Sequence, residues 1–216
     1  MKELIEKYRV AIVLIIILIL TVGGIVTLYY FNNKKISEQV IIWNGPGGEY
    51  KIDIVNKNGF KTYTTYVDIR GQRYGYPLRH SPYDVENISI QNNILPILLS
   101  KQGIYITRDS DLGTKTNQSA SISSMEFGEI LGSGQFGIYK KGVKSAFTNQ
   151  TKESIDYKIQ TITCSNITKN IGVIYMKLSK ENKIYINNEC IILEATDGDN
   201  LIKVGEKLAY KLLGVF

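Results

Sequence analysis

The chain has 216 residues, of which 44% are hydrophobic, 10% aromatic and 21% charged. This composition is typical of a chain that folds around a core, and it excludes an intrinsically disordered protein. Of the 26 basic and 20 acidic residues, five basic and two acidic ones lie in residues 1–35, so the formal charge of +6 divides into +3 there and +3 in the rest. A balance of +3 over the remaining residues excludes the basic surface of a nucleic-acid-binding domain.

Residues 10–31 form an apolar segment without a single charged side chain. As a helix these 22 residues would measure about 33 Å, which matches a hydrocarbon core about 30 Å thick. The segment therefore predicts a transmembrane helix that stays in contact with the lipid bilayer. A signal peptide cut after Gly24 is the alternative, but it would leave an apolar new N-terminus. The predicted divisions are a flank at 1–9, the helix at 10–31, a juxtamembrane linker at 32–38 and a β-rich soluble domain at 39–216.

The charges on either side of the apolar segment predict its orientation. Lys2, Lys7 and Arg9 precede it, and Lys34 and Lys35 follow it. Because basic residues are enriched on the cytoplasmic side, the small excess predicts a cytoplasmic N-terminus and an external C-terminal domain.

Two further features of the soluble part agree with an external domain. The chain has two cysteines, Cys164 and Cys190, which permit one disulfide. It also has four acceptor tripeptides for N-glycosylation. These begin at Asn87, Asn117, Asn149 and Asn166.

The first part of the soluble domain alternates with period two, which is typical of half-buried strands. An apolar run at 40–43 precedes a glycine-rich turn at 44–48. Residues 50–55 and 60–69 flank a glycine-containing loop and predict a β-hairpin. Residues 70–84 predict a long loop.

Further strands are predicted along the rest of the domain. Residues 94–99 are apolar, and residues 108–125 are rich in Ser, Thr, Asp and Gly, which predicts a surface loop. A glycine-rich turn is expected within 129–141. The remaining predicted strands are 103–107, 155–163, 171–178, 183–186 and 190–195, with 171–178 and 183–186 expected to form a hairpin.

Residues 199–213 change to a helical period, with Leu201, Val204, Leu208 and Leu212 on one face. Asp199 or Asn200 could cap the start of this helix, and Gly214 could end it. We expect the helix to bury one face against the sheet. The predicted fold is α+β, mainly antiparallel β in a sandwich-like or open sheet, closed by this C-terminal amphipathic helix.

Two glycine-rich segments invite a functional interpretation. Residues 131–137 (LGSGQFG) resemble the glycine-rich loop of protein kinases. The chain lacks the Val-Ala-Ile-Lys, His-Arg-Asp and Asp-Phe-Gly motifs that accompany this loop in kinases. Residues 44–48 lack the Lys-Ser/Thr pair of a phosphate-binding loop. Both segments are therefore interpreted as turns.

Few residues suit metal binding or catalysis, and we predict no metal, no cofactor and no catalytic residue. His80 is the only histidine, and no Gly-x-Ser-x-Gly elbow is present. Asp109 and Asp111 suggest calcium but lack the distal Glu of a calcium loop. A pair of catalytic carboxylates stays open, because sequence alone does not reveal one.

The two cysteines lie 26 positions apart, without the close spacing of a redox pair. Glu189 beside Cys190 also disfavours a reactive thiolate. We predict a structural disulfide between Cys164 and Cys190. Buried free thiols and a redox pair are the alternatives.

One segment combines tyrosine with basic residues, a composition typical of binding hot spots. It predicts an interaction surface, although the rings could instead pack on the edge of the sheet. Its members are Tyr63, Tyr66, Arg70, Arg73, Tyr74, Tyr76, Arg79, His80 and Tyr83.

Together these features predict a non-enzymatic envelope or cell-surface protein whose anchored domain binds another protein, an envelope component or a second copy of itself. An accessory subunit of a membrane complex for secretion, appendages or transport is the first alternative. A membrane-anchored enzyme with an unrecognised carboxylate site is the second.

Overall fold

The computed structural model describes residues 8, 14, 16–24, 37–57, 59–69 and 71–216, and only the backbone of residues 37, 38, 57 and 153. Of the predicted transmembrane segment 10–31, it describes residue 14 and residues 16–24, which are helical. The rest of that prediction lies outside the described residues. Within the described part of the chain, no helix is both long enough and apolar enough to cross a membrane.

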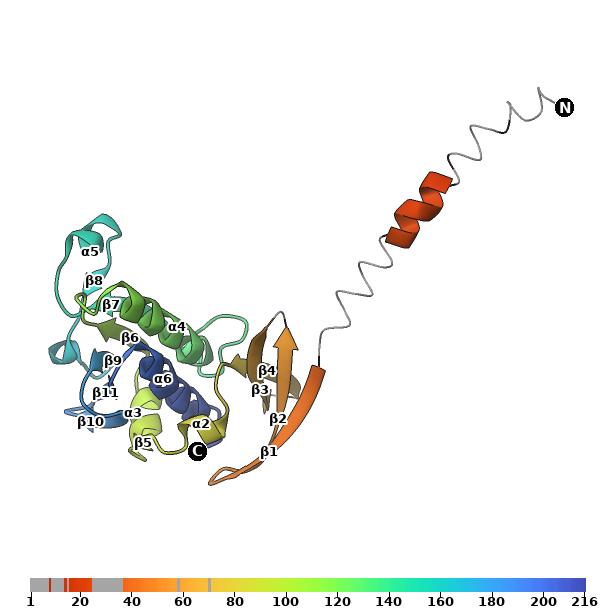
Figure 1. Cartoon of the computed structure of the whole chain (residues 1–216). Coiled ribbons are helices and arrows are strands. Elements are labelled where there is room, and N and C mark those ends of the chain that lie inside the picture. Colours follow the sequence, from red (N-terminus) through yellow and green to blue (C-terminus); the bar gives the residue numbers. More distant parts are fainter. Residues whose placement is uncertain (1–7, 9–13, 15, 25–36, 58, 70) are drawn as a thin grey trace.

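Sheet A is a four-stranded antiparallel meander in which each strand pairs with the next along the chain (Figure 1). Its strands are β1 (Ser37–Gly45), β2 (Gly48–Lys57), β3 (Phe60–Ile69) and β4 (Gln72–Leu78). The predicted hairpin is confirmed as β2 and β3. The prediction of a loop over 70–84 is wrong for β4. Pro77 fits in this strand because β4 is the edge strand of the sheet, where proline is tolerated.

Sheet B has seven strands in the order β5-β10-β11-β9-β6-β7-β8. Their bounds are β5 (Ser89–Ile90), β6 (Gly103–Arg108), β7 (Gly142–Phe147), β8 (Gln160–Thr161), β9 (Ile171–Leu178), β10 (Lys183–Asn187) and β11 (Cys190–Ala195). Only β10 and β11 pair antiparallel, while the other neighbours in this sheet are parallel. The α+β class and the C-terminal helix are confirmed, but the mainly antiparallel arrangement holds for sheet A alone.

Three local predictions in this region are wrong. The loop predicted at 108–125 is largely helical, and the strand predicted at 155–163 contains only β8 after a short helix. The hairpin predicted from 171–178 and 183–186 does not form, because β11 lies between β9 and β10. The helical elements are α2 (Pro82–Val85), α3 (Ile94–Ser100), α4 (Thr114–Leu131), α5 (Lys152–Asp156), the 3₁₀ turn η1 (Cys164–Asn166) and α6 (Gly198–Leu212).

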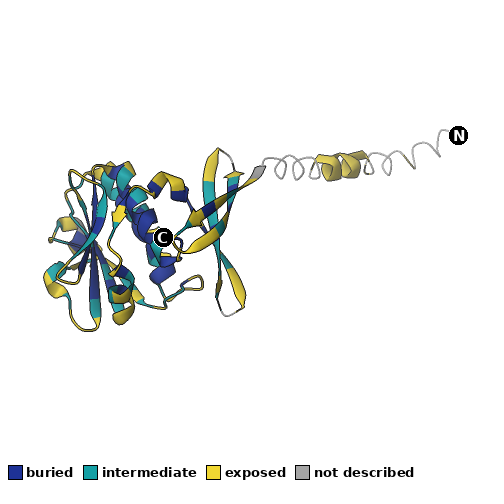
Figure 2. Ribbon diagram, turned by 90° about the horizontal axis from the view of Figure 1, so that it is seen from below, coloured by how far each residue is buried: buried dark blue, intermediate teal, exposed yellow. Residues whose placement is uncertain are grey.

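Helix α6 lies in the middle of the molecule, between sheet B and sheet A (Figure 2). All residues from 204 to 210 are buried, so the helix buries far more than the single face expected from its sequence. Asp197, rather than Asp199 or Asn200, caps it by accepting a hydrogen bond from the Asn200 amide at 2.8 Å. Gly214 follows with a φ of +81°, a conformation that favours glycine, as expected at a helix end.

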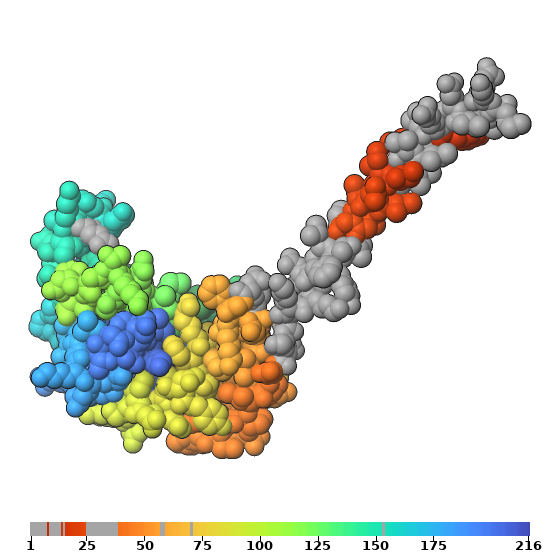
Figure 3. All heavy atoms as spheres, viewed as in Figure 1, coloured from red at the N-terminus to blue at the C-terminus, as the bar shows by residue number. Residues whose placement is uncertain are grey.

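Helices α4 and α6 pack against each other, and the space-filling view shows them side by side (Figure 3). The contact uses small residues from both helices. A Cβ at Gly205 would overlap Ser123 Oγ and lie 2.9 Å from Ser123 Cβ, and a Cβ at Gly198 would lie 3.0 Å from Ser119 Oγ. Ser119 and Ser123, two of the serines that suggested a surface loop, therefore lie on the buried contact face of α4.

Candidate functional site

The structure divides the predicted tyrosine-rich surface between the two faces of sheet A. Tyr76 is buried, and Tyr63 and Tyr74 pack against the same core. On the opposite face, the Arg73 guanidinium carbon lies 4.6 Å from the centre of the Tyr66 ring, a cation–π arrangement. Arg70 lies outside the described residues. Tyr63, Tyr74 and Tyr76 therefore pack on the sheet, which was the alternative to an interaction surface. Tyr66 and Arg73 lie on the surface.

Tyr83 lies in α2, apart from the other tyrosines. Its ring meets the Trp43 ring edge-on at 4.8 Å, and its hydroxyl donates a hydrogen bond to the Ile42 carbonyl at 2.8 Å. Half of Tyr83 remains exposed, at 51%. This residue ties α2 to the first strand of sheet A while keeping one side available to a partner.

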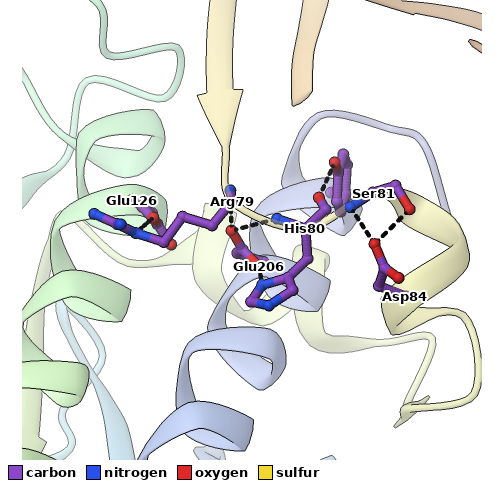
Figure 4. Close-up of polar contacts among 7 residues, drawn as sticks. Arg79, His80, Ser81, Asp84, Glu126 and Glu206 are labelled. Atoms are coloured by element: carbon purple, nitrogen blue, oxygen red, sulfur yellow. Dashed lines mark hydrogen bonds and ion pairs between the residues drawn. The ribbon is translucent and has the colours of Figure 1, made fainter. Parts of the chain in front are cut away.

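Arg79 and His80 follow β4 and enter a polar cluster with carboxylates from α4 and α6 (Figure 4). Glu206 is fully buried in α6 and accepts hydrogen bonds from the backbone amides of Arg79 and His80. Its second oxygen lies 2.5 Å from His80 Nδ1. Both Glu206 oxygens are therefore engaged, which offsets the cost of burying this carboxylate.

Glu126 in α4 completes this polar cluster. Arg79 Nε lies 3.1 Å from Glu126 Oε1, whereas Glu126 Oε2 is buried without a hydrogen-bond partner among the described residues. Burial, followed by repulsion from the Glu206 carboxylate, raises the pKa of Glu126 to about 8, although Arg79 opposes the shift. Near neutral pH the native protein therefore holds a proton on Glu126.

The same segment is pinned from two more sides. The Tyr210 hydroxyl of α6 donates to the His80 carbonyl at 2.7 Å. Ser81 donates through its amide and its hydroxyl to the Asp84 carboxylate, at 2.8 and 2.6 Å, which caps α2. The cluster thus clamps the end of sheet A onto α6 and can hold or exchange a proton at Glu126.

Sequence reasoning considered His80 alone and missed Glu126 and Glu206. Glu206 and Lys207 interrupt an apolar helical stretch, and both are buried. Burial lowers the pKa of Lys207 to about 8, and its Nζ donates to the Glu86 carbonyl at 3.1 Å. The sequence carries no local signal of this burial, because two adjacent charged residues in a helix normally face solvent.

The predicted disulfide between Cys164 and Cys190 is confirmed, with the two Cα atoms 5.4 Å apart. It joins η1 to the start of β11, across the face of sheet B away from α4 and α6. There Val173, Cys190 and Ile192 form a small second core. The route differs from the predicted hairpin, since η1 and not the turn after β9 brings the cysteines together.

The four glycosylation candidates occupy different surroundings. Asn87, Asn149 and Asn166 are exposed, whereas Asn117 is half-buried in α4. The Asn117 side-chain oxygen accepts a hydrogen bond from Arg108 Nε at 3.2 Å. The exposed three are therefore the better acceptors on steric grounds.

Asp109, considered for calcium, and the glycine-rich residues 131–137, compared with the glycine-rich loop of protein kinases, both make contacts within the fold. Asp109 accepts hydrogen bonds from Thr148 Oγ1 at 2.7 Å and from the Tyr175 hydroxyl at 2.8 Å. Among the described residues, no group of three or more His, Cys, Asp or Glu side chains could hold a metal ion. The glycine-rich turn after α4 packs on sheet A, because the Tyr76 hydroxyl donates to the Phe136 carbonyl.

Comparisons with models of protein families, with characterised proteins and with solved structures found no match to this chain.

Proposed function

We propose that this chain is a single-pass membrane-anchored envelope protein whose domain lies outside the cytoplasm and binds another protein or envelope component. The disulfide between Cys164 and Cys190 carries the proposal, because such bonds persist in oxidising compartments and are rare in the cytosol. The uncharged segment 10–31 would supply the anchor, and the basic residues before it favour a cytoplasmic N-terminus.

The contact surface that we propose is the outer face of sheet A, defined by Val40, Ile42, Tyr66 and Arg73. The strand register places Ile41 and Trp43 toward the core and therefore Val40 and Ile42 outward, where they are 46% and 45% exposed. Tyr66 and Arg73 lie on the same side of the sheet. An exposed apolar pair beside a Tyr–Arg stack is the combination that protein interfaces favour.

Protease treatment of intact cells or protoplasts tests the anchor and its orientation. We expect the protease to digest residues 39–216 and to leave the N-terminus protected. A chain that begins at residue 36 should fold and remain in the aqueous fraction without detergent. Digestion only after the cells are lysed, or a truncated chain that still needs detergent, would contradict the proposal.

Affinity purification from mild detergent tests the binding role. The double variant Tyr66→Ala/Arg73→Ala should lose the partner recovered with wild type, whereas Lys152→Ala, an exposed change on α5, should retain it. Recovery of several different chains in fixed ratio would favour the alternative of an accessory subunit in a membrane complex. A larger particle containing this chain alone would indicate self-association, and equal recovery by both variants would exclude the outer face of sheet A.

The polar cluster favours a second candidate, a membrane-anchored enzyme that uses a carboxylate. A carboxyl group whose pKa is raised to about 8, as at Glu126, has the protonation that a general acid requires. One observation opposes this candidate: both Glu206 oxygens are engaged by Arg79 and His80, which leaves neither for a substrate. If the chain is such an enzyme, the variant Glu126→Gln should fold and capture its partner but fail to complement a strain that lacks the chain.

A further inference from the structure

One edge of sheet B lacks a neighbouring strand over part of its length. Strand β8 pairs only with Ala146 and Phe147, so in the described part of the chain no strand covers the outer edge of β7 from Gly142 to Ser145. The Gly142 amide donates to the Gln102 carbonyl and the Thr148 amide to the Arg108 carbonyl, both toward β6. Because the two edges of a strand alternate, the amides of Val143 and Ser145 point away from β6.

This open edge borders a groove of about 640 Å³ between β7 and α4. Val143, Ser145 and Ile106 line it from the sheet, and Ser121, Met125 and Gly128 line it from the helix. A second hollow of about 560 Å³ shares Arg108 and Ser121 with the first and continues toward the start of α4. The two hollows adjoin along the helix, and each lies within the volume range of ligand-binding clefts.

The walls of the groove suit a polypeptide in extended conformation. Ser121 and Gly128 are small, so the helix leaves room beside the sheet edge. Met125 is 72% exposed, and its flexible apolar side chain can adapt to different residues. A strand that enters such a groove gains backbone hydrogen bonds from the edge and side-chain contacts from the helix, a recurrent mode of peptide recognition.

The charges around the groove favour an acidic occupant. Arg108 lines it from the sheet, and the exposed Lys140 lies beside the glycine-rich turn at its end, with Nζ 3.0 Å from the Gly134 carbonyl. Lys144 also borders the groove, but its pairing with Tyr105 turns its side chain toward the opposite face of the sheet. Among the described residues that line the groove, Glu129 is the only acidic one. Arg108 is held in place by the Phe147 ring, 4.8 Å away. A second copy of this chain is the poorer occupant. Pairing two β7 edges would place two Lys144 side chains on neighbouring strands, where like charges repel.

We propose that the groove between α4 and the open edge of β7 binds an extended acidic segment of a partner protein, which adds as a strand to sheet B. This surface is separate from the outer face of sheet A and does not depend on the compartment of the domain. Either proposal can therefore fail without the other.

The probe is a short fluorescein-labelled peptide of alternating Glu and Val residues, with a matched peptide of alternating Lys and Val as control. Full-length chain in detergent micelles should raise the anisotropy of the acidic peptide and bind the basic one at least ~10-fold more weakly. Hydrogen exchange should slow at residues 142–147 when the acidic peptide is present. Equal binding of both peptides, no binding at millimolar concentration, or protection only elsewhere would overturn the proposal.

Two variants separate groove binding from general attraction to a basic chain. Met125→Glu places a negative charge in the groove and should weaken binding of the acidic peptide at least ~10-fold. Tyr157→Glu makes the same charge change at a residue that is 74% exposed and does not line the groove, and it should bind like wild type.

Ser145→Pro removes an outward backbone donor and should also abolish protection of residues 142–147. Thermal melting of each variant confirms that it is folded. Wild-type affinity in Met125→Glu, or an equal loss in Tyr157→Glu, would refute the groove as the site.

Discussion

Replacing Glu126 by Gln should make the stability of the protein less dependent on pH. The Glu126 side chain is only 13% exposed, and burial with repulsion from Glu206 raises its pKa from 4.5 to about 8. Because the native state binds this proton more tightly than the unfolded chain, the stabilisation is complete below the ordinary pKa and is lost as the pH rises through 8. Each pKa unit corresponds to about 1.4 kcal/mol of stability. The free energy of unfolding of the wild type should therefore fall by about 3 kcal/mol between about pH 6 and about pH 9 because of this group.

Trp43 is the only tryptophan and is buried, so its fluorescence can follow unfolding by denaturant across this pH range. The free energy of unfolding should fall with pH more steeply in wild type than in Glu126→Gln, which keeps the shape of the protonated side chain and does not titrate. Glu129→Gln, an exposed change on the same helix, should retain the wild-type slope. If the free energy of unfolding falls equally with pH in wild type and Glu126→Gln, Glu126 is not protonated in the native state. If Glu129→Gln also reduces the dependence on pH, the effect does not belong to Glu126 in particular.

The remaining predictions concern packing and the disulfide. Gly205→Val should lower the free energy of unfolding by about 2–3 kcal/mol, because its side chain overlaps Ser123 on α4, whereas Gly134→Val, where a Cβ meets open space, should cost much less. Denaturant midpoints measure both, and equal losses would disprove the close contact. The double variant Cys164→Ala/Cys190→Ala should remain folded but lose about 3 kcal/mol, because a bridge across 26 positions restricts the unfolded chain. Mass spectrometry without reductant should detect the bridge, and two free thiols in wild type would argue against an external domain.

Several elements could be predicted from the sequence because their causes are local. The β2–β3 hairpin follows from alternating apolar residues on either side of a glycine turn, and Gly59 there has a φ of +82°. Helix α6 follows from a strong helical period that ends at a glycine. The disulfide follows from there being only two cysteines in the chain.

The candidate site could be predicted only in part. Tyr66 and Arg73 meet on the neighbouring strands β3 and β4. They lie close together in the sequence, so the tyrosine- and arginine-rich composition of this segment suggested a surface. His80 was visible as the only histidine, but its partners Glu126 and Glu206 lie on helices far along the chain. Nothing in their immediate neighbours indicates that α4 and α6 converge on the end of β4.

Helix α4 shows what tertiary structure alone decided. Its serines favour loops when considered locally, since their hydroxyls compete for backbone hydrogen bonds. In the folded protein Ser119 and Ser123 are buried where Gly198 and Gly205 of α6 leave space for them. The order of sheet B also depends on distant residues, because β9 pairs with β6 from much earlier in the chain and with β11 rather than with β10, the next strand. Local sequence therefore determined the elements with their own turn and period, and contacts between distant residues decided which polar segments became buried helix.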